Sequence, residues 1–108
     1  MKLILAIVSN DDSSAVSAAL TKGGFSVTRL ATTGGFLRAG NVTLLLGVEN
    51  NKVDEVINII GEYSKQRKQI TPVNTTYIGE SMLSSMPVEV IIGGATIFVL
   101  DVEQFYKI

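Results

Sequence analysis

One short stretch gathers the residue types that could hold a phosphorylated ligand. Residues 32–41 read Thr-Thr-Gly-Gly-Phe-Leu-Arg-Ala-Gly-Asn, and glycines let backbone N–H groups approach and cradle phosphate oxygens. Phe36 offers a flat face for stacking, Arg38 offers a positive charge, and Asn41 offers an amide that can read the edge of a base. No Lys-Ser/Thr pair follows the second glycine, so the stretch is not a P-loop. A plain connection between two strands, with Phe36 and Leu37 packed on a neighbour, is the alternative that these residues leave open.

Few residues of this chain could act as catalytic groups. It contains no cysteine and no histidine, which excludes thiolate nucleophiles, imidazole bases, disulfides and Cys/His zinc sites within one chain. Carboxylates remain, but none is paired at a spacing that implies acid–base catalysis. Asp11 and Asp12 fit helix capping instead, and Asp54, Glu55 and Glu62 fit the polar side of a helix. We therefore expect a protein that is not an enzyme and that has no metal and no cofactor.

The length and net charge of the chain restrict the class of protein further. The 108 residues fit a single domain over 1–108, and the net charge of −1 gives no support to generic binding of DNA or RNA. The densest basic cluster, 65–68, is typical of a solvated helix end. The apolar start, 1–8, breaks off at Ser9-Asn10, which is too short for an export signal or a membrane span. We expect a cytoplasmic protein without membrane insertion.

The pattern of apolar residues predicts five strands and two helices. The first helix begins within 10–13 and ends at Gly23-Gly24, and the second begins at Asn50-Asn51 and ends at the basic cluster. Gly93-Gly94 lies between two apolar runs and indicates a hairpin, since a type I′ turn needs positive φ at both positions. We expect a long mobile loop over 72–86 and a short tail with one helical turn over 102–106. The expected strands are 3–8, 25–32, 42–48, 88–92 and 95–100.

This order of elements predicts an α+β protein with the βαββαβ pattern of a ferredoxin-like fold and an extra strand in a C-terminal hairpin. Such a fold places both helices on one face of an antiparallel sheet. The other face is left bare, and its apolar residues need a partner. The hydrophobic fraction of 46% fits an oligomer in which the sheets of several subunits pack together.

Three stretches resemble the PII-like cyclic-di-AMP receptor proteins of Gram-positive bacteria: 1–8, 27–41 and 87–100. The resemblance spans the whole chain, and the two longer stretches are specific to that family. It implies a homotrimer that binds the cyclic dinucleotide in clefts between subunits, with long loops that change conformation. It also implies a signalling role with a protein target that the sequence does not identify.

The resemblance further implies a set of ligand-contacting positions. Phe36 would stack on adenine, Thr28 would make a polar contact, and Asn41 would read the base edge together with the Gly47 backbone. Arg38 is a lesser candidate. The full set is Thr28, Gly35, Phe36, Leu37, Arg38, Asn41, Gly47 and Phe98.

Departures from the family pattern keep a second function open. The chain has Gly24 and Ser26 where asparagine and arginine are usual, and Lys107 where glutamine is usual. The segment 72–86 lacks the usual glycine-rich stretch with aspartate and tyrosine. Losing an arginine that meets a phosphate costs about 1–3 kcal/mol. The alternative is a trimeric regulatory protein that has lost or changed its nucleotide binding.

Overall fold

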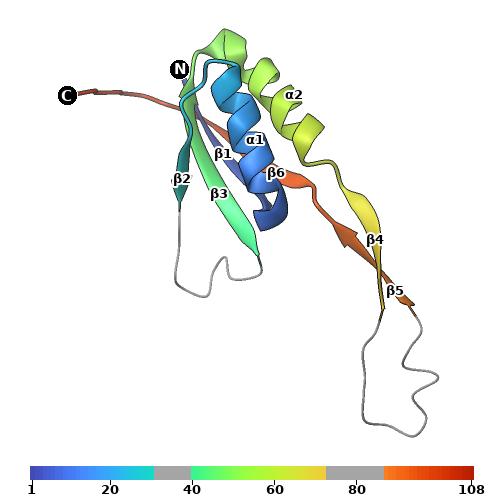
Figure 1. Ribbon diagram of the computed structural model, residues 1–108. Coiled ribbons are helices and arrows are strands. Elements are labelled where there is room, and N and C mark those ends of the chain that lie inside the picture. Colours follow the sequence, from blue (N-terminus) through green and yellow to red (C-terminus); the bar gives the residue numbers. More distant parts are fainter. Residues whose placement is uncertain (31–39, 73–86) are drawn as a thin grey trace, which may run out of the picture.

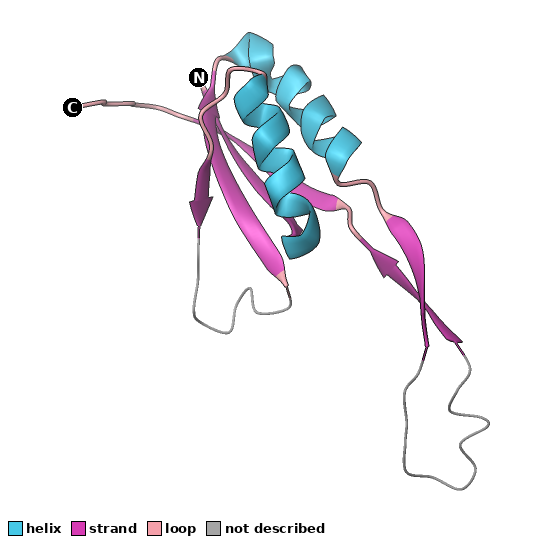
Figure 2. Ribbon diagram, viewed as in Figure 1, coloured by secondary structure: helices cyan, strands magenta, loops and turns pink. Residues whose placement is uncertain are grey.

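A four-stranded antiparallel sheet with two helices on one face forms the body of the protein (Figures 1 and 2). The computed structural model describes residues 1–30, 40–72 and 87–108. The sheet order is β2-β3-β1-β6, which is the ferredoxin-like arrangement once β4 and β5 are set aside. The elements are β1 (Lys2–Ser9), α1 (Asn10–Lys22), β2 (Thr28–Leu30), β3 (Asn41–Val48), the 3-10 turn η1 (Asn50–Lys52), α2 (Val53–Tyr63), β4 (Arg67–Pro72), β5 (Pro87–Ile92) and β6 (Ala95–Asp101).

The core lies between the sheet and the helices. Side chains alternate across a strand, so every second residue of β1 faces the helices and is buried there: Ile4, Ala6 and Val8. The antiparallel register places Leu46 of β3 beside Ile4 and Leu44 beside Ala6. The apolar stripes of the helices close this layer with Val16, Leu20, Val56 and Ile60.

Capping interactions are present at both ends of α1. Ser9, one residue before the expected range, is the N-cap, and its hydroxyl accepts a hydrogen bond of 3.3 Å from the backbone N–H of Asp12. At the other end Gly24 has φ of +92°. The N–H of Phe25 donates to the Leu20 carbonyl at 3.0 Å, the Schellman pattern that needs a left-handed residue at Gly24. The predicted helix end is confirmed.

The predicted terminal hairpin is wrong. β5 pairs with β4 in a separate two-stranded ribbon, whereas β6 pairs with β1 from Lys2↔Asp101 to Val8↔Ala95. Gly93 and Gly94 do have positive φ, +81° and +86°, but they form the corner at which the chain passes from the ribbon to the sheet. The reason is burial: pairing with β1 places Ile97 beside Ala6 and packs it against the core. The extra strands therefore lie between α2 and the last strand of the body.

Other boundaries also differ from the expectation. α2 ends at Tyr63, so Arg67 and Lys68 of the basic cluster begin β4 and do not end a helix. The residues after β6 form no helical turn. Most of the predicted mobile loop and the end of the predicted strand 25–32 lie outside the described residues. Among the helices of the described ranges, none combines the length and apolar character that a membrane crossing requires.

The corner glycine allows a direct test of this topology. A Cβ at Gly93 would lie 2.6 Å from the Lys65 carbonyl oxygen and 2.6 Å from Arg67 Nη1. Gly93→Ala, strained by its positive φ as well, is expected to lower the free energy of unfolding by about 1–3 kcal/mol. Gly61→Ala is the matched control, because Gly61 lies in α2 with open space around it and should gain up to about 1 kcal/mol. Equal urea midpoints for Gly93→Ala and the wild type would contradict the corner.

Candidate functional site

The face of the sheet opposite the helices is apolar and open. Register aligns one row across all four strands on this open face: Thr28, Leu45, Leu5 and Phe98. Phe98 is 53% exposed there. Thr28 and Phe98 lie at opposite ends of the row, about 14 Å apart, since strands are spaced by about 4.8 Å. The open face therefore presents both predicted residues without bringing them into contact.

A hollow of about 440 Å³ lies beside Thr28, between β2, β3 and the residues that follow β6. We call it the tail cavity. Its lining includes Ser26, Thr28, Gly47 and Lys107. Gly47 leaves its backbone accessible, because the nearest heavy atom to an added Cβ would be the Met1 sulfur at 4.0 Å. Two aromatic residues of the tail, Phe105 and Tyr106, line it as well.

The tail cavity contains two of the predicted ligand-contacting residues and two of the positions at which the chain departs from the family pattern. Thr28 and Gly47 share it as ligand-contacting candidates, and Ser26 and Lys107 lie in the same hollow. Hydroxyls, an ammonium group, aromatic rings and free backbone are the groups that bind a phosphorylated base. Sequence reasoning missed Lys107 and the tail aromatics as members of this group, because no local pattern places the C-terminal tail beside β2.

Asn41 lies at the opposite end of β3. It lines two adjoining hollows of about 490 and 410 Å³, which share Ser9 and Gly93 in their lining. We call them the junction cavities. Gln66, Gly94 and Thr96 also line the larger one. The larger cavity therefore lies between Asn41 and the corner at which the β4–β5 ribbon joins the body.

Asn41 and Gly47 cannot serve one small ligand from the same chain. They are six residues apart on one strand, which separates them by about 20 Å at roughly 3.3 Å per residue. Of the predicted set, Gly35, Phe36, Leu37 and Arg38 lie outside the described residues.

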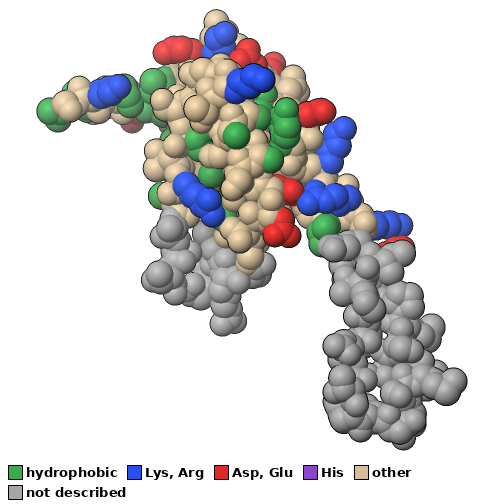
Figure 3. Space-filling view, in the orientation of Figure 1, with side chains coloured by type: hydrophobic (Ala, Val, Ile, Leu, Met, Phe, Trp, Pro, Cys, Tyr) green, Lys and Arg blue, Asp and Glu red, His purple; other side chains and the backbone are tan. Residues whose placement is uncertain are grey.

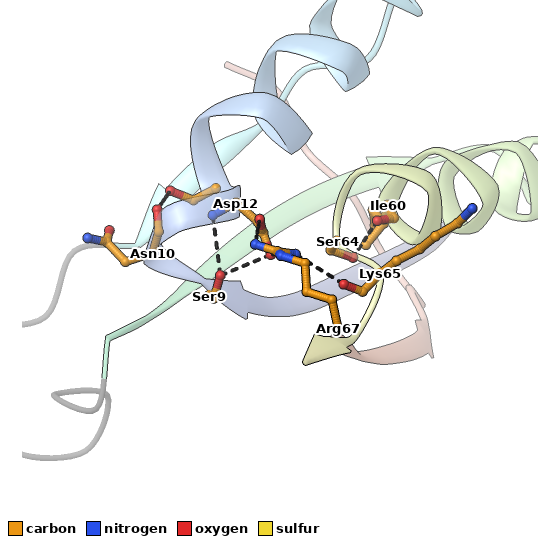
Figure 4. Close-up of polar contacts among 8 residues, drawn as sticks. Ser9, Asn10, Asp12, Ile60, Ser64, Lys65 and Arg67 are labelled. Carbon is orange, nitrogen blue, oxygen red and sulfur yellow. Dashed lines mark hydrogen bonds and ion pairs between the residues drawn. The ribbon is translucent and has the colours of Figure 1, made fainter. Parts of the chain in front are cut away.

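A buried carboxylate anchors the ribbon beside the junction cavities (Figure 4). Arg67 Nη2 donates to Asp12 Oδ1 at 2.9 Å, and Arg67 Nη1 donates to Asp12 Oδ2 at 3.3 Å. Ser9 Oγ donates to the same carboxylate at 3.0 Å. The Asp12 side chain is 9% exposed and that of Arg67 is 44% exposed. We call this ion pair the clamp.

The clamp shifts the titration of its carboxylate. The hydrogen bond from Arg67 lowers the pKa of Asp12 below 3.8, and the Ser9 hydroxyl adds to this effect while burial opposes it. The sequence assigned Asp12 to helix capping alone. The partner was missed because the two residues are 55 positions apart and Arg67 was placed at a helix end.

The same helix turn also holds the described flanks of segment 31–39. The Asn10 side-chain oxygen accepts a hydrogen bond of 3.2 Å from Arg29 Nη2. The Asn10 backbone N–H donates to the Gly40 carbonyl at 2.5 Å. The strand that leads into the segment and the residue that leaves it are therefore both fixed to the start of α1.

The whole chain, residues 1–108, matches the model of the family described as cyclic-di-AMP receptor. The protein belongs to this family, and membership suggests binding of cyclic-di-AMP in signalling. A crystal structure of a functionally unknown protein from Pediococcus pentosaceus ATCC 25745 is similar throughout, with 37% sequence identity and a TM-score of 0.74. The similarity covers 99% of this chain and 96% of that one.

The clamp predicts a pH dependence of stability. Because the pKa of Asp12 is lowered on folding, its contribution is present at pH values above the ordinary aspartate pKa. It is lost as the pH falls through the folded value. Asp12→Asn is expected to lower the free energy of unfolding by about 1–3 kcal/mol at pH 7, and the difference from wild type should shrink below pH 3.8.

Urea unfolding between pH 7 and pH 2 measures this difference. Asp54→Asn is the control, because Asp54 is an exposed carboxylate in the first turn of the other helix. It should change the free energy of unfolding little at any pH. A gap between wild type and Asp12→Asn that stays constant with pH would show that the clamp carries no charge-dependent stability.

Proposed function

We propose that this protein is a non-enzymatic signal transduction protein that binds cyclic-di-AMP as a second messenger. The observation that carries the proposal is the match of all 108 residues to the cyclic-di-AMP receptor family. The tail cavity supports it, because it combines groups suited to a phosphate with groups suited to a base. The proposal also places the protein in a bacterial cytoplasm. There it would signal to a protein target through rearrangement of its loops.

The assembly in this proposal is a homotrimer with the nucleotide in clefts between subunits. Support comes from the open face, where Leu30, Phe98 and Leu100 are each more than 40% exposed. Further support comes from the separation of Asn41 and Gly47, which lets the two contact one nucleotide only across a subunit boundary. Phe36 stacks on adenine, and Thr28 and Asn41 make polar contacts.

Lys107 takes part in the same cleft. Where relatives carry an arginine, this chain has Ser26, and the phosphate end of the site needs another cation. Lys107 lines the tail cavity together with Ser26 and Thr28. Its ammonium group supplies a compact positive charge on a flexible stem.

A trimeric regulatory protein without nucleotide binding is the second candidate, and Ser26 in the tail cavity favours it. Calorimetric titration with cyclic-di-AMP, ATP and ADP separates the two functions. The main proposal expects heat with cyclic-di-AMP and a weaker or absent signal with the mononucleotides. No heat with any of the three, from an intact trimer, would support the second candidate.

Loss of the stacking ring should weaken binding without unfolding the protein. Phe36→Ala is expected to raise the Kd for cyclic-di-AMP about 5- to 150-fold, the equivalent of about 1–3 kcal/mol per stacked base. Tyr63→Ala is the control, since Tyr63 is a half-exposed aromatic at the end of α2, outside the lining of these cavities. Calorimetry measures both, and an unchanged Kd for Phe36→Ala would remove the assigned role.

The assembly itself can be weighed by light scattering. The wild type should give a mass three times that of the chain at micromolar concentration. Leu100→Glu places a charge on the open face, where Leu100 is 44% exposed, and should dissociate the assembly because a buried charge without a partner is costly. Ala18→Glu, on the exposed side of α1, should not. A monomeric wild type would contradict the proposed assembly.

Restoring an arginine at position 26 should strengthen the binding of cyclic-di-AMP. Ser26→Arg is expected to lower the Kd for cyclic-di-AMP, and most of the gain should disappear at high salt because the added attraction is screened. The double variant with Gly24→Asn should keep its fold, since asparagine is the next-best residue in the left-handed position after a helix. Calorimetry at low and high salt is the measurement. If neither variant binds more tightly than the parent, the phosphate does not lie near Ser26.

A further inference from the structure

A second hollow adjoins the tail cavity at the end of the body where α2 begins. It has a volume of about 330 Å³, and its lining includes Glu49 and Lys52 at the two ends of the 3-10 turn η1. We call it the η1 cavity. It shares Met1, Ser26 and Gly47 with the tail cavity. A ligand that occupies one of the two cavities can therefore extend into the other.

The two cavities meet at Met1 and Gly47. The Met1 sulfur lies 4.0 Å from the position that a Cβ on Gly47 would occupy. The Met1 carbonyl accepts a hydrogen bond of 3.2 Å from the Val102 N–H, which holds the start of the tail at this boundary. A methionine side chain is unbranched and flexible, so the boundary can adapt to a ligand that crosses it. The η1 cavity also has room beside Gly24, where an added Cβ would meet nothing within 4 Å.

The η1 cavity has a lysine and a glutamate in its lining. The Lys52 N–H donates to the Glu49 carbonyl at 2.9 Å, so one tight turn holds both residues. The Lys52 ammonium lies 4.0 Å from the Glu55 carboxylate, and their side chains are 52% and 49% exposed. An exposed pair of this kind contributes little, so the ammonium can turn toward a ligand at small cost. Figure 3 shows basic and acidic side chains next to each other at this end of the body, so their fields offset each other at a distance.

The chemistry of the ligand calls for a second cation. A cyclic dinucleotide carries two phosphates, and each has a negative charge. Lys107 in the lining of the tail cavity is available to one of them. Lys52 is the lysine that the adjoining η1 cavity offers to the other, and an ammonium group on a flexible stem suits a phosphate.

We propose that the bound nucleotide extends from the tail cavity into the η1 cavity, where Lys52 contacts its second phosphate and Glu49 opposes that contact. The inference rests on the proposed function, since it takes cyclic-di-AMP as the ligand of the tail cavity. The Glu49 carboxylate repels the same phosphate and so limits the affinity. Removing the two charges therefore has opposite effects on binding, whereas a purely structural role of the turn would make both substitutions harmful.

Calorimetry with cyclic-di-AMP tests both charges. Lys52→Gln is expected to raise the Kd at least about tenfold, the lower end for a hydrogen bond between charged groups. Its Kd should also depend less on salt than that of the wild type. Glu49→Gln is expected to lower the Kd at least about twofold. Lys52→Arg, which keeps the charge, should bind within about threefold of the wild type.

Lys22→Gln is the matched control for the lost charge. Lys22 is an exposed lysine in the last turn of α1, outside the described lining of both cavities. Its Kd should stay within about twofold of the wild type, because a distant exposed charge is screened. Equal urea midpoints for the wild type and the variants show that a change in Kd does not come from loss of the fold.

Nuclear magnetic resonance shows the contact directly. Lysines are methylated with a carbon-13 label, which keeps their charge, and the signals of Lys22, Lys52 and Lys107 are assigned from Lys→Arg variants. Addition of cyclic-di-AMP should shift the signals of Lys52 and Lys107 and leave that of Lys22 in place. A shift of Lys107 without one of Lys52 would confine the nucleotide to the tail cavity and overturn the inference.

The outcomes separate this inference from the function on which it rests. No binding of cyclic-di-AMP to the wild type overturns the proposed function and the inference with it. Binding by the wild type that Lys52→Gln leaves unchanged, or that Lys22→Gln weakens equally, overturns the inference alone. A higher Kd for Glu49→Gln would overturn the role of Glu49 as an opposing charge.

Discussion

The fold depends on a central strand that is apolar on both of its faces. The even-numbered residues of β1, such as Ile4 and Val8, are buried under the helices. Its odd-numbered residues, Leu3, Leu5 and Ile7, face the other way and stay partly exposed. Two helices satisfy the first face. In the described part of the chain the second face stays partly exposed, and the proposed assembly would bury it against another subunit.

The candidate site is also affected by the exposed second face of the sheet. Residues that could bind a nucleotide lie around the rim of the open face, with Thr28 and Gly47 toward one end of β3 and Asn41 at the other. In the proposed function, one chain therefore supplies two half-sites, which lie about 20 Å apart along β3 at roughly 3.3 Å per residue. Packing of open faces against one another would bring half-sites of different subunits together, so that burial of apolar surface and formation of the proposed binding site become the same event.

Local sequence patterns predicted the four-stranded sheet and its two helices, because helix ends, strand periodicity and turns depend on residues close together in the sequence. The C-terminal end of α1 and the approximate positions of the four strands of the body follow from periodicity and turn residues. Strand partners do not follow in the same way. Gly93-Gly94 has positive φ both in the predicted hairpin and in the observed corner, so turn chemistry alone could not choose between β4 and β6 as the partner of β5. The clamp was missed for the same reason, since Asp12 and Arg67 meet only in three dimensions. The resemblance placed Thr28 and Gly47 in the candidate set, but not Lys107 beside them.

A complementation assay tests most directly whether the nucleotide site is shared between subunits. Asn41→Ala should damage one half-site and Gly47→Glu, which adds a negative charge, should damage the other, so that each variant alone binds cyclic-di-AMP poorly. The two are unfolded, mixed in equal amounts, refolded together and titrated by calorimetry. A shared site predicts recovery of about a quarter of the wild-type sites, because a cyclic trimer repeats one head-to-tail interface and a quarter of these combine two intact halves. No recovery in the mixed trimers, from variants that each refold and assemble, would contradict a site built by two subunits.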